Sequence, residues 1–268
     1  MSDETLVWSG GYADPSAVDT ELGWDLYINR RAGPDKGTFR VSTLDGVSLT
    51  DESPLLLIGA ATARAVVMDG GVRLYYPASA PATTGRPPDG EDLIYSAWAS
   101  DGLAFTDDPG ARLRAPWGEP GGPALLQLDD GSWRFWVDLS EAGATDPAVL
   151  HAEIWGGSSP DGLDWTLDEA PTLVGEEGIE GTAPEAQVLH PFVFAAHDSY
   201  WRFYNAHAAL YLARSSDGLA WEKLGPLGLD GADLCAAALD DGRARIWYGR
   251  YSEETQGEIY TAILDLPR

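Results

Sequence analysis

The sequence predicts an all-β fold, a five-bladed β-propeller, from three observations. The first is a repeated turn: Asp-Gly pairs recur at intervals of about 56 to 60 residues, each followed three residues later by a large apolar side chain, at positions 45–49, 101–105, 161–165 and 217–221. Asp-Gly between strand-like segments is a signal for a tight hairpin, because glycine tolerates a positive φ and aspartate can accept hydrogen bonds from the following backbone. A hairpin repeated at this period indicates blades arranged around an axis.

The second observation is an aromatic, strand-like segment that occurs five times, at residues 24–28, 72–76, 133–136, 201–204 and 245–248. In most copies a short turn separates it from an earlier apolar run, such as residues 65–68 or 124–128. Each repeat therefore predicts a four-stranded meander: an apolar inner strand, an aromatic second strand, a third strand that leads to the Asp-Gly turn, and a short outer strand.

The third observation concerns the two ends of the chain. The fifth repeat has three predicted strands, at residues 234–239, 243–250 and 258–264, and no outer strand. Residues 5–8 form an isolated strand-like segment, and Trp8 matches the aromatic residues of the other outer strands. Pairing this segment with the last blade would close the ring and leave no open edge between the first and last blades. We expect residues 1–268 to form one domain, with no N-terminal segment removed.

The charge of the chain restricts its partners. Its 43 acidic and 17 basic residues give a net charge of -26, which disfavours nucleic acid and anionic membrane surfaces. It is compatible with a sugar or another small polar ligand, and an acidic surface also promotes solubility. No secretory signal pattern or membrane-length apolar run is present, so we expect a cytoplasmic protein. Its single cysteine, Cys235, lies in an apolar run and is expected to be buried and unreactive.

Polar residues are expected at the mouth of the channel. Aligning the inner strands by the turns that follow them places one residue from each blade there: Asp14, Ala61, Gly122, His190 and Asp233. Two carboxylates and an imidazole on one axis can supply an acid and a base with separated pKa values. They can equally fill the mouth with hydrated polar groups, and the sequence leaves both interpretations open.

The five-blade plan, the opening Ala13-Asp14-Pro15 and the repeated Ser-Xaa-Asp-Gly-Xaa-Xaa-Trp/Phe resemble the glycoside hydrolase superfamily of family 43 arabinanases and xylosidases, invertases and levansucrases. The resemblance implies that Asp14 is a general base or nucleophile. It also implies an Asp just before a Pro in blade three, which orients the substrate, and a Glu near the start of blade four, which is the general acid. In this chain Gly122 and Leu189 occupy those two positions, and His190 follows Leu189. Glu185, or Glu180, would supply the acid if a loop insertion shifts the register.

Three further residues are candidates for substrate binding. Arg64 interrupts an apolar inner strand and is expected to face the channel or a carboxylate. Trp117 lies outside the repeat in a loop on the channel face, and His207 lies in a short hairpin on that face. Alternatively, Trp117 is a packing residue and His207 is an exposed side chain without a binding role. No zinc or calcium ligand pattern is present, so we expect no cofactor, although the resemblance allows a calcium ion in the channel.

Three functions remain open from the sequence. The first is a glycoside hydrolase-like enzyme that acts on a sugar or small polar substrate, with Asp14 as the base and His190 or Glu185 as the acid. The second is a diverged enzyme that uses the same pocket for an isomerisation, elimination or cyclisation in specialised metabolism. The third is a non-catalytic propeller that binds a carbohydrate or a protein partner.

Overall fold

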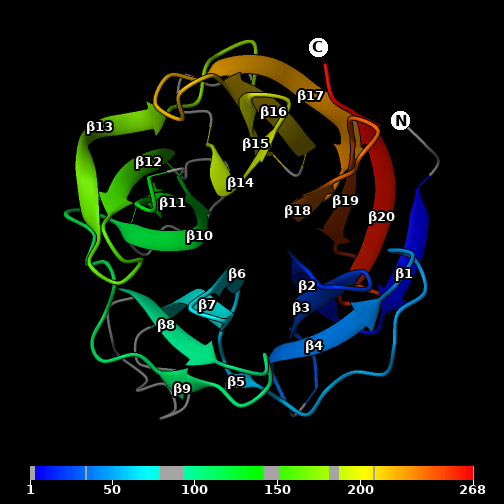
Figure 1. Cartoon of the computed structure of the whole chain (residues 1–268). Coiled ribbons are helices and arrows are strands. Elements are labelled where there is room, and N and C mark those ends of the chain that lie inside the picture. Colours follow the sequence, from blue (N-terminus) through cyan, green and yellow to red (C-terminus); the bar gives the residue numbers. More distant parts are fainter. Residues whose placement is uncertain are drawn as a thin grey trace.

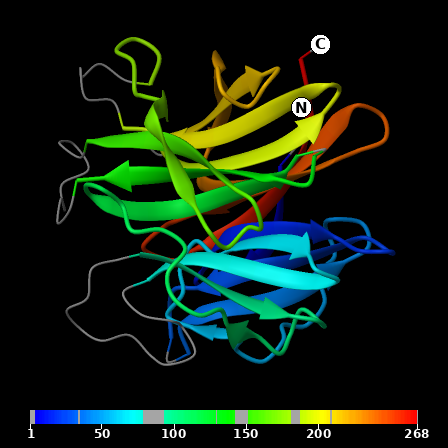
Figure 2. The ribbon, with the colours of Figure 1, turned by 60° about the vertical axis from the view of Figure 1, so that its left-hand side comes forward.

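A computed structural model shows five four-stranded antiparallel sheets arranged in a ring (Figure 1). It describes residues 4–33, 35–78, 93–128, 130–141, 151–180, 187–207 and 209–267. The predicted five-bladed β-propeller is confirmed. Figure 2 gives an oblique view in which the strands run between the two faces of the ring. The described residues include no helix long and apolar enough to cross a membrane.

Each of the first four blades is a meander that proceeds from the axis outward. Blade one contains β2 (Tyr12–Asp19), β3 (Trp24–Arg30), β4 (Gly37–Thr43) and β5 (Leu57–Ile58). Blade two contains β6 (Arg64–Met68), β7 (Gly71–Ala78), β8 (Leu93–Ala99) and β9 (Thr106–Asp107). Blade three contains β10 (Glu119–Gln127), β11 (Trp133–Ser140), β12 (Ala152–Ser159) and β13 (Thr166–Leu173). Blade four contains β14 (Leu189–Ala196), β15 (Ser199–Ala206), β16 (Ala209–Ser215) and β17 (Glu222–Asp230).

The fifth blade combines the two ends of the chain, as predicted. Strands β18 (Ala232–Ala238), β19 (Arg243–Arg250) and β20 (Glu258–Asp265) follow in order, and β1 (Thr5–Ser9) is the outer strand. β1 runs antiparallel to β20, and Figure 1 shows the two side by side. Trp8 packs edge-on against Tyr12 with the ring centroids 5.9 Å apart. The N-terminal strand therefore ties the last blade to the first.

The repeated turn owes its conformation to its aspartate and its glycine. In the fourth copy, Oδ1 of Asp217 accepts hydrogen bonds from the backbone N–H groups of Leu219 at 2.8 Å and Ala220 at 3.0 Å. Gly218 adopts a φ of 74°, in the left-handed region that favours glycine. The aspartates of the other three copies, at positions 45, 101 and 161, accept the same pair of backbone hydrogen bonds.

Aromatic residues of the second strands join neighbouring blades. The hydroxyl of Tyr27 donates to the carbonyl of Gly102 in the next blade, and Tyr75 donates to Gly162, each at 3.0 Å. Trp247 in blade five donates to the carbonyl of Gly46 in blade one at 3.0 Å. These aromatic side chains are fully buried, so their role is to pack between blades and to hydrogen-bond from one blade to the next.

Candidate active site at the channel mouth

The inner strands share an unusual backbone conformation where they enter the channel. Asp14, Thr62, His190 and Asp233 have φ values of 53°, 47°, 52° and 56°. A non-glycine residue in this region costs on the order of 1–3 kcal/mol, and such residues concentrate at functional sites. In blades one, three, four and five, the pairing of the inner and second strands also shifts by a bulge at this point.

The mouth residues of the five blades lie together, although Gly122 of blade three does not share the positive φ of the other four. Asp14, Thr62, Gly122, His190 and Asp233 line one small space around the axis. This confirms the predicted register for four of the five blades. In blade two the equivalent residue is Thr62 and not Ala61, because the left-handed residue comes one position later before β6.

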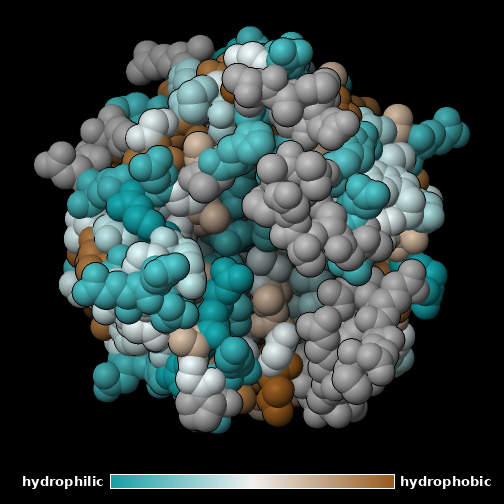
Figure 3. All heavy atoms as spheres, turned by 180° about the vertical axis from the view of Figure 1, so that it is seen from behind, coloured by the Kyte–Doolittle hydropathy of each residue, from teal (hydrophilic) through white to brown (hydrophobic). Residues whose placement is uncertain are grey.

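Above this space the channel opens into a cavity of about 790 Å³. Four of the predicted site residues line it, namely Asp14, His190, His207 and Asp233, and Arg31 also contributes. Figure 3 shows this face of the molecule, which is hollowed near its centre, with mostly hydrophilic described residues around the hollow. A concave site with several convergent polar groups is the usual form of a small-molecule site.

Asp14 is a buried carboxyl group in direct contact with a second one. Its Oδ2 accepts hydrogen bonds from Nδ2 of Asn29 at 3.0 Å and from the backbone N–H of Thr62 at 3.1 Å. Its side chain also hydrogen-bonds to Asp233. Burial, followed by the negative charge of Asp233, raises the pKa of Asp14 to about 7, against the lowering effect of Arg31 and Asn29. Asp14 therefore gains and loses a proton near neutral pH.

His190 is a partly exposed cation between carboxylates. Its Nδ1 lies 2.8 Å from Oδ1 of Asp233, but the ring N–H is poorly aligned with this oxygen, so the contact is an ion pair and not a well-formed hydrogen bond. Burial alone would lower the pKa of His190, but Asp233 and Asp138 raise it to about 10. For Asp233, burial raises the pKa, and the stronger combined effect of His190, Asp14 and Arg31 holds it below its usual range.

Two neighbouring glycines make room for this arrangement. A Cβ on Gly121 would lie 2.1 Å from Oδ2 of Asp138, and a Cβ on Gly122 would lie 3.4 Å from Nδ1 of His190. Asp138 is 2% exposed, and its Oδ1 accepts a hydrogen bond from the backbone N–H of His190 at 3.0 Å. The glycines of blade three and the histidine of blade four thus lie in contact with one another around Asp138.

The remaining candidates lie away from the cavity or outside the described residues. Arg64 is buried beneath the mouth, on the small space that Asp14 and His190 also line. Trp117 does not line the mouth cavity; it stacks on His151 with the ring centroids 6.0 Å apart and packs edge-on against Trp155. Glu185 lies outside the described residues.

Glu180, the alternative to Glu185, has a structural environment. It is 1% exposed and accepts hydrogen bonds from the hydroxyl of Tyr204 at 2.7 Å and from Nζ of Lys223 at 2.8 Å. It does not line the mouth cavity. These contacts hold the segment before residue 181 against blade four, so Glu180 is not available as a catalytic acid in this conformation.

The sequence interpretation missed two charged residues, Arg31 and Asp138. Arg31 follows β3 directly, is exposed, and lowers the pKa values of Asp14 and Asp233 by its positive charge. Asp138 lies on β11, whereas the sequence predicted that this strand ends at residue 136 and that a loop on the channel face begins at Asp138. Within the described ranges, no group of three or more His, Cys, Asp or Glu side chains is placed to hold a metal ion.

The fold is a five-bladed β-propeller, the architecture of solved glycoside hydrolases of families 43 and 32. Neither the family models nor the curated proteins contain a match to the chain. Solved structures do match. A thermostable family-43 glycoside hydrolase aligns with a TM-score of 0.72 at 15% identity, over 96% of this chain and 95% of that one.

Two further solved structures support the same fold. The GH43_1 enzyme from Xanthomonas citri aligns with a TM-score of 0.71 at 15% identity, over 97% of this chain and 90% of that one. The Bombyx mori GH32 beta-fructofuranosidase aligns with a TM-score of 0.66 at 14% identity, over 97% of this chain and 62% of that one. The predicted resemblance is confirmed for the fold.

Proposed function

We propose that the chain is an enzyme that binds a sugar or another small polar molecule in the mouth cavity and transfers a proton through Asp14. The observation that carries this proposal is the environment of Asp14. Its carboxyl group lines a cavity of about 790 Å³, and its pKa is raised to about 7 by burial and by Asp233. General acid–base catalysis is most efficient when the pKa of the group lies near the working pH.

The neighbouring residues support a division of roles. Asp14 acts as the base, because its ionised form is accessible near neutral pH and two N–H groups hold its orientation. His190 has a pKa of about 10 and keeps its proton, so it serves as a fixed positive charge and hydrogen-bond donor rather than as a proton source. Arg31 at the cavity edge adds further donors for hydroxyl groups.

Hydrolysis of a glycoside needs a second carboxyl group on the other side of the scissile bond. The two carboxyl groups lie roughly 5–5.5 Å apart in retaining enzymes and 6.5–9.5 Å apart in inverting ones. Asp14 and Asp233 are in hydrogen-bonding contact, which leaves no room for a scissile bond between them, and Asp138 does not line the mouth cavity. For a hydrolytic mechanism we propose Glu185, which lies outside the described residues, as the acid.

The single carboxyl cluster favours a second candidate, which is an enzyme that moves protons without hydrolysis. An isomerisation or an elimination needs one base close to an acidic C–H or O–H group and a positive charge that stabilises the developing anion. Asp14 and His190 supply this combination. A third possibility, a non-catalytic propeller with a flat binding face, is disfavoured because the mouth holds a concave cavity.

The experiment compares purified wild-type protein with Asp14→Asn, Glu185→Gln and the exposed control Asp164→Asn. Family-43 neighbours are known in complexes with xylose and xylotriose, so pentosides are the first probes, followed by fructosides. Binding is measured by calorimetry and turnover by product analysis. We expect Asp14→Asn to reduce turnover at least about 100-fold and Asp164→Asn to leave it unchanged.

The Glu185→Gln variant separates the two candidates. Loss of turnover in both Asp14→Asn and Glu185→Gln supports hydrolysis. Loss in Asp14→Asn alone, with a rearranged product that contains no added water, supports the non-hydrolytic enzyme. Turnover that survives Asp14→Asn, or sugar binding that does not depend on any residue of the mouth cavity, overturns the proposal.

A further inference from the structure

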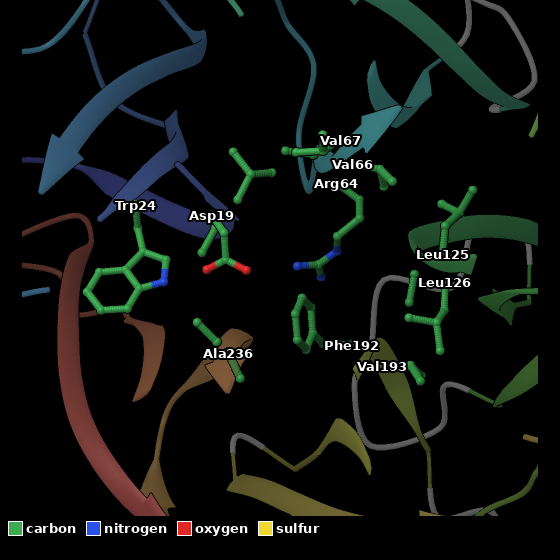
Figure 4. Close-up of a pocket in the computed structure, with 15 residues that line it drawn as sticks. Asp19, Trp24, Arg64, Val66, Val67, Leu125, Leu126, Phe192, Val193 and Ala236 are labelled. Atoms are coloured by element: carbon green, nitrogen blue, oxygen red, sulfur yellow. The ribbon is translucent and has the colours of Figure 1, made fainter. Parts of the chain in front are cut away.

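A second cavity lies further along the channel, on the far side of Arg64 from the mouth. Its volume is about 400 Å³, and it is formed by the later residues of the inner strands. The walls are mostly apolar and include Val66, Leu125 and Phe192. Figure 4 shows the side chain of Arg64 extending into this cavity over the ring of Phe192.

Arg64 is buried with unused hydrogen-bonding capacity. It is 7% exposed, its Nε donates to the carbonyl of Pro123 at 3.1 Å, and its guanidinium carbon lies 4.6 Å from the ring centroid of Phe192. Nη1 is buried without an acceptor, and among the described residues no carboxylate forms an ion pair with Arg64. Burial disfavours its charge, but a guanidinium stays protonated in proteins. The arginine therefore places a positive charge at the wall of a mostly apolar cavity, with Asp14 and Asp233 as its nearest negative charges.

The chemistry of the cavity selects a particular ligand class. A guanidinium matches a carboxylate, which is attracted to its charge and can accept a charge-assisted hydrogen bond from it. The apolar walls match a compact hydrocarbon or aromatic body, and the volume suffices for a small molecule. The carboxylate of Asp19 lines the same cavity and disfavours a ligand with a second negative charge. We propose that this cavity binds a small organic monocarboxylate through Arg64, at a site separate from the mouth.

This proposal does not depend on the proposed catalytic function. Benzoate is a suitable probe, and benzyl alcohol is its uncharged counterpart of similar shape. We expect calorimetry of the wild-type protein to show saturable binding of benzoate and at least about tenfold weaker binding of benzyl alcohol. Equal binding of the two probes, or no binding of benzoate, overturns the proposal.

Variants locate the site. We expect Arg64→Leu to weaken benzoate binding at least about tenfold, and Asp19→Asn to strengthen it because a like charge is removed. Arg31→Leu, which alters the arginine of the mouth cavity, serves as the matched control and leaves benzoate binding unchanged. Loss of binding in Arg31→Leu with retention in Arg64→Leu would place benzoate at the mouth and overturn the proposal.

A crystal of the wild-type protein with 4-bromobenzoate provides a test that does not depend on the folding of a variant. The proposal predicts anomalous density for bromine between β6 and β14, with the carboxylate against the guanidinium of Arg64. Bromine density only at the mouth cavity or only on the outer surface would contradict it.

Discussion

The imidazole of His190 lies within contact distance of the position that a Cβ on Gly122 would occupy. An ideal Cβ on Gly122 would lie 3.4 Å from Nδ1 of His190 and 3.3 Å from Cβ of Thr62. The propellers that this chain resembles are expected to have a carboxylate at the position of Gly122 and a glycine at that of His190. A side chain at position 122 would therefore meet the imidazole, so we expect the two positions to be coupled in stability.

This relationship predicts a measurable coupling. Gly122→Asp in the wild-type background should reduce the free energy of unfolding by about 1–3 kcal/mol, because the new side chain crowds the imidazole. In the His190→Gly background the same substitution should cost about 1 kcal/mol or less, since the space is free. Urea unfolding of the four proteins in this cycle tests the prediction. Equal costs in both backgrounds would show that the positions are independent.

The glycine one position earlier should be even less tolerant. A Cβ on Gly121 would lie 2.1 Å from Oδ2 of Asp138, which is fully surrounded by protein. We expect Gly121→Ala to reduce the free energy of unfolding by about 2–4 kcal/mol, because the carboxylate must leave its hydrogen bond with His190. Gly122→Ala is the matched control and should cost clearly less. Denaturant unfolding of the two variants gives the comparison, and the reverse order would contradict this account.

Removing the Asp14 carboxyl group should make stability less dependent on pH. The pKa of Asp14 is 3.8 in its reference state and about 7 in the folded protein. Its contribution to stability is therefore full below pH 4 and is lost as pH rises through 7. Relative to wild type, Asp14→Asn should gain up to a few kcal/mol between pH 4 and pH 8, at ~1.4 kcal/mol per pKa unit. Thermal unfolding at several pH values measures this gain, and a constant difference would refute the shift.

The closing strand should contribute to stability through Trp8. This side chain is partly buried, packs against Tyr12 and joins the apolar cluster of blades one, four and five. We expect Trp8→Ala to cost about 2 kcal/mol or more, whereas Leu6→Ala, on the same strand but 47% exposed, should stay within about 0.5 kcal/mol. Similar small costs in chemical unfolding would mean that the N-terminal strand adds little to ring closure.

The arrangement of strands into blades could be predicted because the turns between strands are specified by residues close together in the sequence. An aspartate and a glycine specify each turn through hydrogen bonds to the next few residues, and the lone strand at residues 5–8 had one free edge to pair with. The same repeat placed Asp14, His190 and Asp233 at the mouth. In blade two the left-handed residue is Thr62, one position after the expected Ala61, so the register there was wrong by one residue.

Tertiary contacts decided the rest of the site. Asp138 reaches His190 from a second strand, through the space left by Gly121, and no spacing in the sequence signals this contact. Arg31 reaches the cavity from the residue after β3, outside the repeat. Arg64 was expected to face the channel or a carboxylate; it faces the channel and has no ion-pair partner among the described carboxylates.

The most direct test of the account is the titration of the Asp14 carboxyl group. Carbon-13 NMR of protein labelled at the aspartate carboxyl carbons follows each group from pH 3 to pH 9, and the resonance absent from Asp14→Asn identifies Asp14. The account predicts a midpoint of about 7 for Asp14, and a shift to lower pH in Asp233→Asn because the neighbouring negative charge is removed. A midpoint near the usual value of an aspartate, or one that Asp233→Asn does not move, would contradict it.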